Sequence, residues 1–229
     1  MKRQIFLIII LFLAFGYGFV RTLSSKESKA YNGEGSIIYK ITYSEDNPYK
    51  DKLMLPHETN LFFKGTKASF ITNAMGMVQM VNLLDDKNKK FTSMMINTLG
   101  ENFAFSDTPE EVKEQENSPE IKIEPTTETK MIAGLECNKA VVKDLTHNKK
   151  FDIYFYSKIR VYLGNSPYKD FNYLLMEYQD TRYGLPMILE AKKVDFNPID
   201  TSLLTIHGNY KWVDKSTFLS IVQNTKIPL

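Results

Sequence analysis

The stretch TNLFFKGTKASFITN, residues 59–73, decides the fold that we expect of this chain. It contains two short runs, 59–64 and 67–73, that combine aromatic and β-branched residues with polar ones. Gly65 and Thr66 separate the two runs, and short runs with such a break between them are typical of a β-hairpin. The stretch therefore predicts two antiparallel strands joined by a tight turn.

The same pattern continues on both sides of this hairpin. Upstream, residues 36–43 (SIIYKITY) mix β-branched, aromatic and polar residues and lead to a turn at 46–48 (DNP). Downstream, runs at 78–84 and 90–96 follow, set apart by a glycine and by the turn-forming residues 85–88 (DDKN). This spacing predicts a meander of antiparallel strands.

The remainder of the chain is expected to add further strands and two short helices. Thr108, Pro109 and Glu111 form a capping-box pattern that predicts a helix over 109–116. Residues 118–129 contain two prolines and are expected to form a loop or an edge strand. Strands are also predicted over 139–145, 151–156, 186–196 and 202–206, and a final helix over 216–223, capped by Ser216. About nine or ten strands without βαβ alternation favour an open or partly closed antiparallel sheet.

The N-terminal segment predicts export. Lys2 and Arg3 precede an apolar run of 16 residues, Ile5 to Val20, which matches the layout of a signal peptide. The run is shorter than the ~20 residues that span a bilayer comfortably, so we favour cleavage over an uncleaved N-terminal anchor. Residues 1–20 are thus assigned as a signal peptide or anchor, 21–33 as a polar tether and 34–229 as one β-rich domain. The expected location is the periplasm or the cell envelope.

The charge balance argues against a nucleic-acid partner. The chain carries 29 basic and 27 acidic residues, for a net charge of +2. Without Lys2 and Arg3 the two kinds are equal in number, so no basic surface is expected. Cys137 is the only cysteine, so an intramolecular disulfide cannot form, and we expect it to be a small buried apolar residue.

No pattern of catalytic or metal-binding residues is found. The three histidines, His57, His147 and His207, lie in unrelated contexts. His57 and Glu58 resemble the start of a zinc-protease motif, but Leu61 stands where the second histidine is needed. A Gly-x-Ser-x-Gly elbow and a glycine-rich phosphate loop are also absent from the sequence. We therefore expect a non-enzymatic protein without metal or cofactor.

The chain is rich in side chains that could line an apolar cavity. It has 10 methionines, 15 phenylalanines and 13 tyrosines. Core filling is one interpretation, and soft-metal binding by methionine thioethers is another. A third is that flexible methionines and flat aromatics line a cleft for an apolar ligand such as an acyl chain. The candidate cavity-lining residues are Met75, Met77, Met80, Met94, Phe103 and Phe105.

Five short motifs in a fixed order carry a family resemblance. They are Gly35-x-Ile37-x-Tyr39, Phe62 to Lys67 (FFKGTK), Ile132 to Ala140 (IAGLECNKA), Tyr154 to Tyr156 (YFY) and Gly184 to Glu190 (GLPMILE). The order resembles exported Bacteroidetes proteins named for a Gly-Leu-Pro-Gly-Leu-Ile motif, and a related group with an Ile-x-Gly-Tyr-x-Cys-Lys-Lys-Ala signature. Leu135, Met187 and His207 depart from those patterns.

The resemblance implies a fold similar to that of the periplasmic lipoprotein carriers of the LolA and LolB type. In such a fold an antiparallel incomplete β-barrel wraps over one or two short helices on its concave side, around an apolar interior. The family supplies no catalytic residues that could be carried over to this chain.

Three hypotheses for function follow from these observations. The leading one is a non-enzymatic envelope binding or carrier protein for a lipid-like or apolar ligand. The second is a structural or interaction protein of the envelope, with a filled core and an envelope protein as partner. The third is an unrecognised hydrolase.

Overall fold

The computed structural model describes residues 33–43, 55–74, 76–88, 90–97, 100–108, 111, 121–163, 167–168, 170–182 and 185–224. The chain divides into two units, Met1–Ala30 and Tyr31–Leu229. Every described residue belongs to the second unit, so the expected signal peptide or anchor lies outside the described residues. No helix among those residues is long and apolar enough to cross a membrane.

The described part of the chain is built around one sheet of twelve strands. The strands are β1 (Glu34–Tyr43), β2 (Glu58–Lys64), β3 (Lys67–Ala74), β4 (Val78–Asp85), β5 (Lys90–Asn97), β6 (Phe103–Ser106), β7 (Ile121–Ile132), β8 (Leu135–Asp144), β9 (Lys149–Arg160), β10 (Tyr173–Arg182), β11 (Leu185–Asp195) and β12 (Lys211–Trp212). A 3₁₀ helix, η1 (Thr201–Leu204), and an α-helix, α3 (Lys215–Asn224), complete the described elements.

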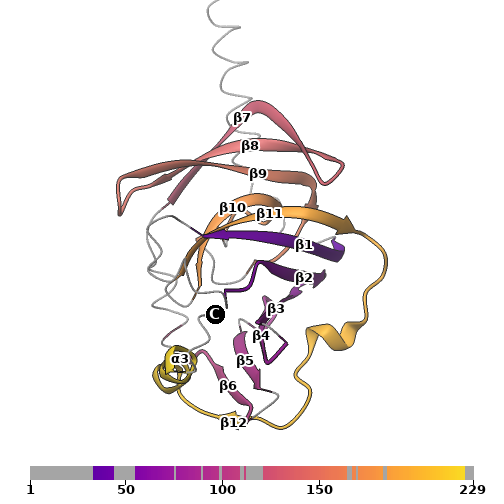
Figure 1. The fold of residues 1–229 in the computed structure, drawn as a ribbon. Coiled ribbons are helices and arrows are strands. Elements are labelled where there is room, and N and C mark those ends of the chain that lie inside the picture. Colours follow the sequence, from indigo (N-terminus) through magenta and orange to yellow (C-terminus); the bar gives the residue numbers. More distant parts are fainter. Residues whose placement is uncertain are drawn as a thin grey trace, which may run out of the picture. The chain divides into compact units, whose positions relative to one another are not determined.

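The sheet consists of two antiparallel meanders that meet at a single seam. Its strand order is β12-β6-β5-β4-β3-β2-β1-β11-β10-β9-β8-β7, so β1 to β6 form one meander and β7 to β11 the other. Antiparallel pairing of β1 with β11 joins the two. The strands β12 and β7 are the two edges, and the sheet is not closed into a barrel (Figure 1). The expected mainly β fold with an open antiparallel sheet is therefore confirmed.

The hairpins predicted from the opening stretch are present. β2 and β3 pair across the Gly65-Thr66 turn with Lys64 opposite Lys67. The next strands, β4 and β5, continue the meander in register. Of the two alternatives for residues 118–129, the edge strand is correct for the described part, because β7 begins at Ile121 and lies at the edge of the sheet.

Alternation along the strands produces the core. In β1, Ile37, Tyr39 and Ile41 are buried while their neighbours are half-buried or exposed, as a period of two requires. These side chains join a large apolar cluster that also includes Val142 of β8 and Leu174 of β10. The core therefore extends over both meanders and spans the seam between them.

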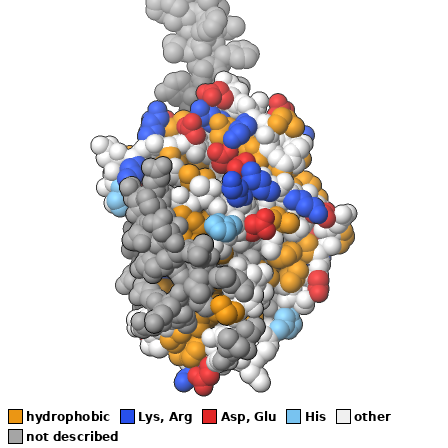
Figure 2. All heavy atoms as spheres, viewed as in Figure 1, with side chains coloured by type: hydrophobic (Ala, Val, Ile, Leu, Met, Phe, Trp, Pro, Cys, Tyr) orange, Lys and Arg blue, Asp and Glu red, His pale blue; other side chains and the backbone are white. Residues whose placement is uncertain are grey.

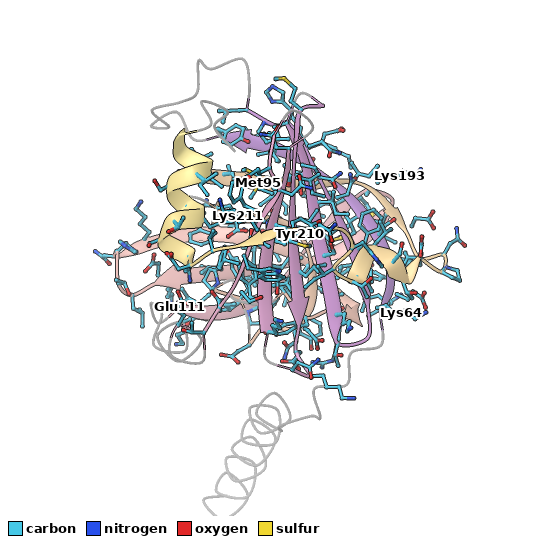
Figure 3. All side chains as sticks on the ribbon, turned by 90° about the horizontal axis from the view of Figure 1, so that it is seen from below. Lys64, Met95, Glu111, Lys193, Tyr210 and Lys211 are labelled. Atoms are coloured by element: carbon cyan, nitrogen blue, oxygen red, sulfur yellow. The ribbon has the colours of Figure 1, made fainter. Side chains whose placement is uncertain are left out.

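α3 packs on the concave side of the sheet. Its buried residues Phe218 and Val222 contact a cluster that includes Met80, Met95 and Phe105, which lie on β4, β5 and β6. Figure 3 shows Met95 between α3 and the sheet. This helix confirms the expectation of a short helix on the concave side.

A long connection carries the chain from β11 to the opposite edge of the sheet (Figure 1). It passes through η1, which contacts β2 and β3, and then reaches β12 beside β6. Tyr210, just before β12, packs against a cluster on the other face of the sheet that includes Val81 and Leu83. The connection therefore lies on the convex face, opposite α3.

Two details of the C-terminal part differ from expectation. The strand predicted over 202–206 is wrong: this region holds the 3₁₀ helix η1, because the side chain of Asp200 accepts a hydrogen bond from the Ser202 amide and starts a helical turn. The expected cap Ser216 is also wrong, since the helix begins at Lys215 and the carboxylate of Asp214 accepts from the Thr217 amide at 2.8 Å.

The predicted helix over 109–116 lies almost wholly outside the described residues, apart from Glu111. The capping box itself is present. The Thr108 amide donates to the Glu111 carboxylate at 2.7 Å, and the Glu111 amide donates to the Thr108 hydroxyl at 3.2 Å. Glu111 is helical.

Charges on the surface are mixed in sign. On the face shown in Figure 2, Lys and Arg side chains are interspersed with Asp and Glu. Among the outer strands β7 to β9, Lys139 pairs with Glu128 at 3.1 Å and with Asp152 at 2.9 Å, and Lys143 pairs with Glu124 at 2.7 Å. Such exposed pairs contribute little to stability, on the order of 0–1 kcal/mol each.

Candidate ligand-binding cleft

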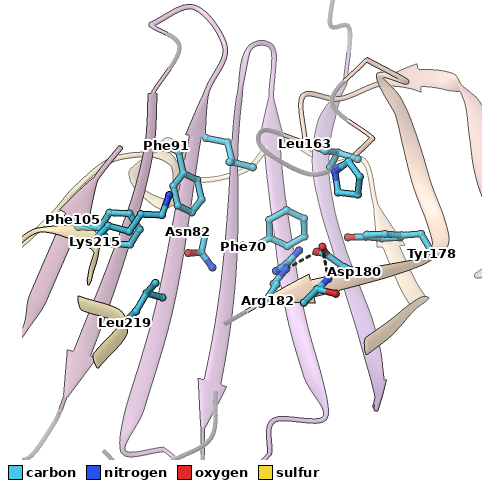
Figure 4. A pocket seen from close by; sticks show the side chains of 13 residues that line it. Phe70, Asn82, Phe91, Phe105, Leu163, Tyr178, Asp180, Arg182, Lys215 and Leu219 are labelled. Atoms are coloured by element: carbon cyan, nitrogen blue, oxygen red, sulfur yellow. Dashed lines mark hydrogen bonds and ion pairs between the residues drawn. The ribbon is translucent and has the colours of Figure 1, made fainter. Parts of the chain in front are cut away.

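A cleft of about 260 Å³ lies on the concave side of the sheet. Its walls come from β3 to β6, from β10, from the segment around Leu163 and Pro167, and from α3 (Figure 4). Both meanders and the C-terminal helix therefore contribute to one site.

The apolar wall of the cleft follows from strand register. Phe70 of β3 lies opposite Asn82 of β4, Asn82 lies opposite Ser93 of β5, and Ser93 lies opposite Phe105 of β6. Residues that are directly opposite each other share a face of a sheet, so this row points to the concave side. Apolar side chains from this face and its surroundings form the wall, namely Phe70, Leu84, Phe91, Phe105, Leu163 and Leu219.

One end of the cleft carries an ion pair from β10. Arg182 Nε lies 2.8 Å from Asp180 Oδ2, and both side chains are largely buried. The guanidinium also lies 3.9 Å from the centre of the Phe70 ring, close enough for a cation–π interaction. The other Asp180 oxygen accepts the Thr181 amide at 2.8 Å. Arg182 is thus held in place by a carboxylate and a ring.

The opposite end carries a second ion pair, at the start of α3. Lys215 Nζ lies 3.1 Å from Asp107 Oδ1, and the Asp107 side chain is fully buried. Lys215 also lies 5.9 Å from the centre of the Phe105 ring. Positive charge at both ends of the cleft is therefore balanced by a carboxylate.

Two polar groups on neighbouring strands interact on the floor of the cleft. The Ser93 hydroxyl donates to the Asn82 side-chain oxygen at 2.7 Å, and both residues are buried. This bond offsets part of the desolvation cost of burying two polar side chains.

Three buried tyrosines pack together beside the cleft. The rings of Tyr39 and Tyr168 each meet the Tyr178 ring edge-on, with centroids 5.8 and 5.7 Å apart. The Tyr39 hydroxyl donates to the Leu175 carbonyl at 2.6 Å, and the Tyr168 hydroxyl donates to the Gln179 carbonyl at 2.7 Å. Burial raises the pKa of all three hydroxyls well above the usual value, so they remain protonated.

Tyr178 differs from its two neighbours. It is 2% exposed and lines the cleft, and no acceptor for its hydroxyl proton is found among the described residues. Figure 4 shows the hydroxyl pointing into the cleft on the side of Asp180 and Arg182. Burial raises the Tyr178 pKa, and the nearby Arg182 guanidinium opposes this rise through its charge and by donating a hydrogen bond to the hydroxyl oxygen.

Three of the candidate cavity residues lie on the concave face. Phe105 lines the cleft and packs against Phe218 of α3, with ring centroids 4.8 Å apart. Met80 is buried under α3 and borders a minor adjoining pocket of about 20 Å³. Phe103 is half-buried and packs against the same cluster.

The other three candidates are not part of the cleft wall. Met94 lies opposite Val81 and Ala104, and it packs with both on the convex face. Met77 is half-buried in the turn between β3 and β4. Met75 lies outside the described residues. Both faces of the sheet are covered in this region, so a run of methionines does not by itself reveal which of them faces the cleft.

The residues that sequence reasoning missed come mainly from β10. Tyr178, Asp180 and Arg182 lie on this strand, which the sequence pattern did not predict. Three consecutive buried residues, Leu174 to Met176, interrupt the period of two, and the pairing of β10 with β9 shifts register on both sides of them. The only signal was the group of ionisable side chains in YQDTR, at 178–182.

Histidines and Cys137 lie away from the cleft lining. His147 Nδ1 contacts Asp144 at 2.7 Å, and His207 Nε2 contacts the Thr205 hydroxyl. No group of three or more His, Cys, Asp or Glu residues able to hold a metal is found within the described ranges. Cys137 is buried in β8, as expected, and burial raises its pKa to about 11.

Comparisons with known proteins find a similar fold but no related sequence. No protein-family model matches the sequence, and a search of curated proteins finds no match either. A crystal structure of PNGF-II in space group C2 is similar over 83% of this chain, with 19% identity and a TM-score of 0.50. A second PNGF-II structure, in space group P21, matches 84% of the chain with 18% identity and a TM-score of 0.52.

This chain spans about a third of the PNGF-II chain, 33% and 34% in the two structures. At such low identity the likeness concerns the fold alone. Within the described residues, fold and cleft together define a β-sheet protein with a concave, mostly apolar cleft.

Proposed function

We propose that this chain is a non-enzymatic binding or carrier protein of the cell envelope, whose concave cleft holds a lipid-like or otherwise apolar ligand. The observation that carries the proposal is the cleft itself: an apolar wall from strands β3 to β6, the segment around Leu163 and helix α3, together with a few fixed polar groups. Ligand sites in proteins typically have this composition.

The size of the cleft limits the ligand. A volume of about 260 Å³ is just below the range of about 300–1,000 Å³ that is usual for drug-sized ligands. A single chain or ring system of modest size suits it best. The ligand would be carried one molecule at a time.

Envelope location and the lack of catalysis are parts of the proposal that rest on the sequence. The positive N-terminal residues and the apolar run that follows support export. The open sheet with a helix on its concave side is the arrangement that the resemblance to lipoprotein carriers implies, and this supports a carrier role only at the level of the fold. Sequencing the N-terminus of the mature protein is expected to show that the segment up to about residue 20 has been removed.

Ligand binding is testable on the purified full chain with the uncharged fluorescent dye phenylnaphthylamine. We expect saturable binding of about one dye per chain, and native mass spectrometry is expected to detect a co-purified apolar molecule. Leu219→Trp places an indole in the cleft from α3 and is expected to weaken dye binding at least about tenfold, because it fills the site.

The matched control is Leu145→Trp, the same substitution at a turn residue that is 55% exposed and outside the cleft. It is expected to bind the dye like the unchanged protein. If the unchanged chain shows neither a saturable site nor a co-purified molecule, the carrier proposal fails. The structural or interaction protein of the envelope is then the better hypothesis.

A further inference from the structure

The hydroxyl of Tyr178 is a polar group whose proton finds no acceptor among the described residues. Two buried side-chain oxygens in the described residues lack one, Ser69 Oγ and Tyr178 Oη, and of these only Tyr178 lines the cleft. Buried hydroxyls in native proteins almost always form a hydrogen bond. A buried exception that points into a cleft indicates a bond that a ligand completes.

The two neighbouring tyrosines show which kind of hydrogen-bond partner a buried hydroxyl in this cluster takes. Tyr39 and Tyr168 pack against the same ring, and each donates its proton to a carbonyl oxygen. The Arg182 guanidinium near Tyr178 can only donate, so it cannot accept the Tyr178 proton. The missing partner of Tyr178 is therefore a hydrogen-bond acceptor.

The charges around the cleft indicate that this acceptor is uncharged. Arg182 is paired with Asp180, and Lys215 is paired with Asp107. A carboxylate entering the site would add a negative charge without an unbalanced cation to meet it, and burial of such a charge is costly. A carbonyl oxygen of an ester or amide satisfies the hydroxyl without this cost.

We propose that the cleft binds an apolar molecule that carries an uncharged carbonyl group, with Tyr178 Oη donating to the carbonyl oxygen and the aromatic and aliphatic wall holding the apolar part. The inference rests on the proposed function, because it assigns the ligand class of the same cleft. Tyr178 is then a specificity-determining residue, since it discriminates an ester or amide from a hydrocarbon of equal length.

The test is displacement of phenylnaphthylamine from the full chain by three compounds with the same chain length: methyl octanoate, octanoate and octane. In the unchanged protein, methyl octanoate is expected to displace the dye at the lowest concentration. Tyr178→Phe removes one oxygen atom and retains the ring, so dye and octane are expected to bind as before. Methyl octanoate is expected to bind about fivefold more weakly, the value of one hydrogen bond.

Tyr39→Phe is the matched control, because it removes a hydroxyl from the same cluster that is bonded to the backbone and does not line the cleft. It is expected to retain the preference for methyl octanoate. The inference is overturned if Tyr178→Phe binds methyl octanoate as well as the unchanged protein does. It is also overturned if octanoate is the strongest competitor.

These outcomes are separate from a failure of the proposed function. In that case the unchanged protein shows no saturable dye binding at all, and Leu219→Trp has no effect. If the dye binds and Leu219→Trp blocks it while the three compounds compete equally, the cleft is a general apolar site and only the carbonyl assignment is wrong.

Discussion

At the scale of single residues, three tyrosines of one cluster have different roles. Tyr39 and Tyr168 use their hydroxyls to tie the sheet together through backbone carbonyls. Tyr178 contributes the same ring, but its hydroxyl proton has no acceptor in the part of the chain that the structure describes. A buried hydroxyl without a partner costs about 1–3 kcal/mol, whereas a formed hydrogen bond stabilises by about 1 kcal/mol.

This difference predicts opposite effects of the same substitution. Tyr39→Phe is expected to lower the free energy of unfolding by about 1 kcal/mol, because the hydrogen bond to the Leu175 carbonyl is lost. Tyr178→Phe, measured without ligand, is expected to leave this free energy unchanged or to raise it. Urea unfolding of the two variants provides the comparison, and equal destabilisation by both would contradict it.

The burial of a single residue could be predicted from the sequence where its cause is local. Cys137 stands alone in a strand-like run and is expected to behave as a small apolar residue. It is buried in the structure. The surroundings of Tyr178 and Arg182 in the cleft were not predictable in this way. Their environment is created by Phe70, more than 100 positions earlier in the chain, and by α3 at its end.

At the scale of elements, the strands with regular alternation were predicted and the irregular ones were not. β2 to β5 alternate or are bounded by clear turns, and their hairpins are as expected. β6 and β12 have only four and two residues, which is too short for a pattern. β10 has shifts of register that interrupt its period. The strand predicted over 202–206 was wrong because a capping aspartate outweighed β propensity.

The start of α3 predicts a pH dependence. The hydroxyls of Ser216 and Thr217 and the Thr217 amide donate to the Asp214 carboxylate, and these bonds hold its pKa well below the ordinary value of 3.8. The stabilisation is therefore complete above about pH 4 and is lost as the pH falls through the lower pKa of the folded state.

Asp214→Ala is expected to lower the Tm at neutral pH by about 2–4 °C, because the helix loses its cap. Asp214→Asn retains an oxygen that can accept from the Thr217 amide, so a smaller decrease is expected. Thermal unfolding at neutral pH and below about pH 3 distinguishes the two effects, since the gap between the unchanged protein and Asp214→Asn should narrow in acid. A constant gap would show that the carboxylate charge is unimportant.

At the scale of the whole molecule, stability depends on the seam between the two meanders. Gly35 lies at this seam, with a φ of 151°, and an added Cβ would lie 2.3 Å from the Asp195 carbonyl oxygen. Most residues cannot adopt such a conformation, and the neighbouring atom is backbone that cannot easily move. The close pairing of β1 with β11 therefore requires glycine here.

Gly35→Ala is expected to reduce the free energy of unfolding by about 1–3 kcal/mol from backbone strain, and further because of the contact with Asp195. Gly65→Asn is the control. Gly65 has a φ of 56°, which asparagine tolerates, and open space around its Cβ position, so almost no change is expected. The midpoints of chemical unfolding of the two variants test this prediction. A midpoint for Gly35→Ala equal to that of the unchanged chain would show that the seam can adjust to the added Cβ.

The seam also sets the order of events while the chain is being made. β11, the partner of β1, is synthesised about 150 residues after it, which takes on the order of ten seconds at ordinary synthesis rates. α3, which completes the cleft, is made later still. A nascent chain can thus form hairpins but neither the seam nor the cleft. On the proposed function, the cleft becomes able to hold a ligand only after α3 has left the ribosome.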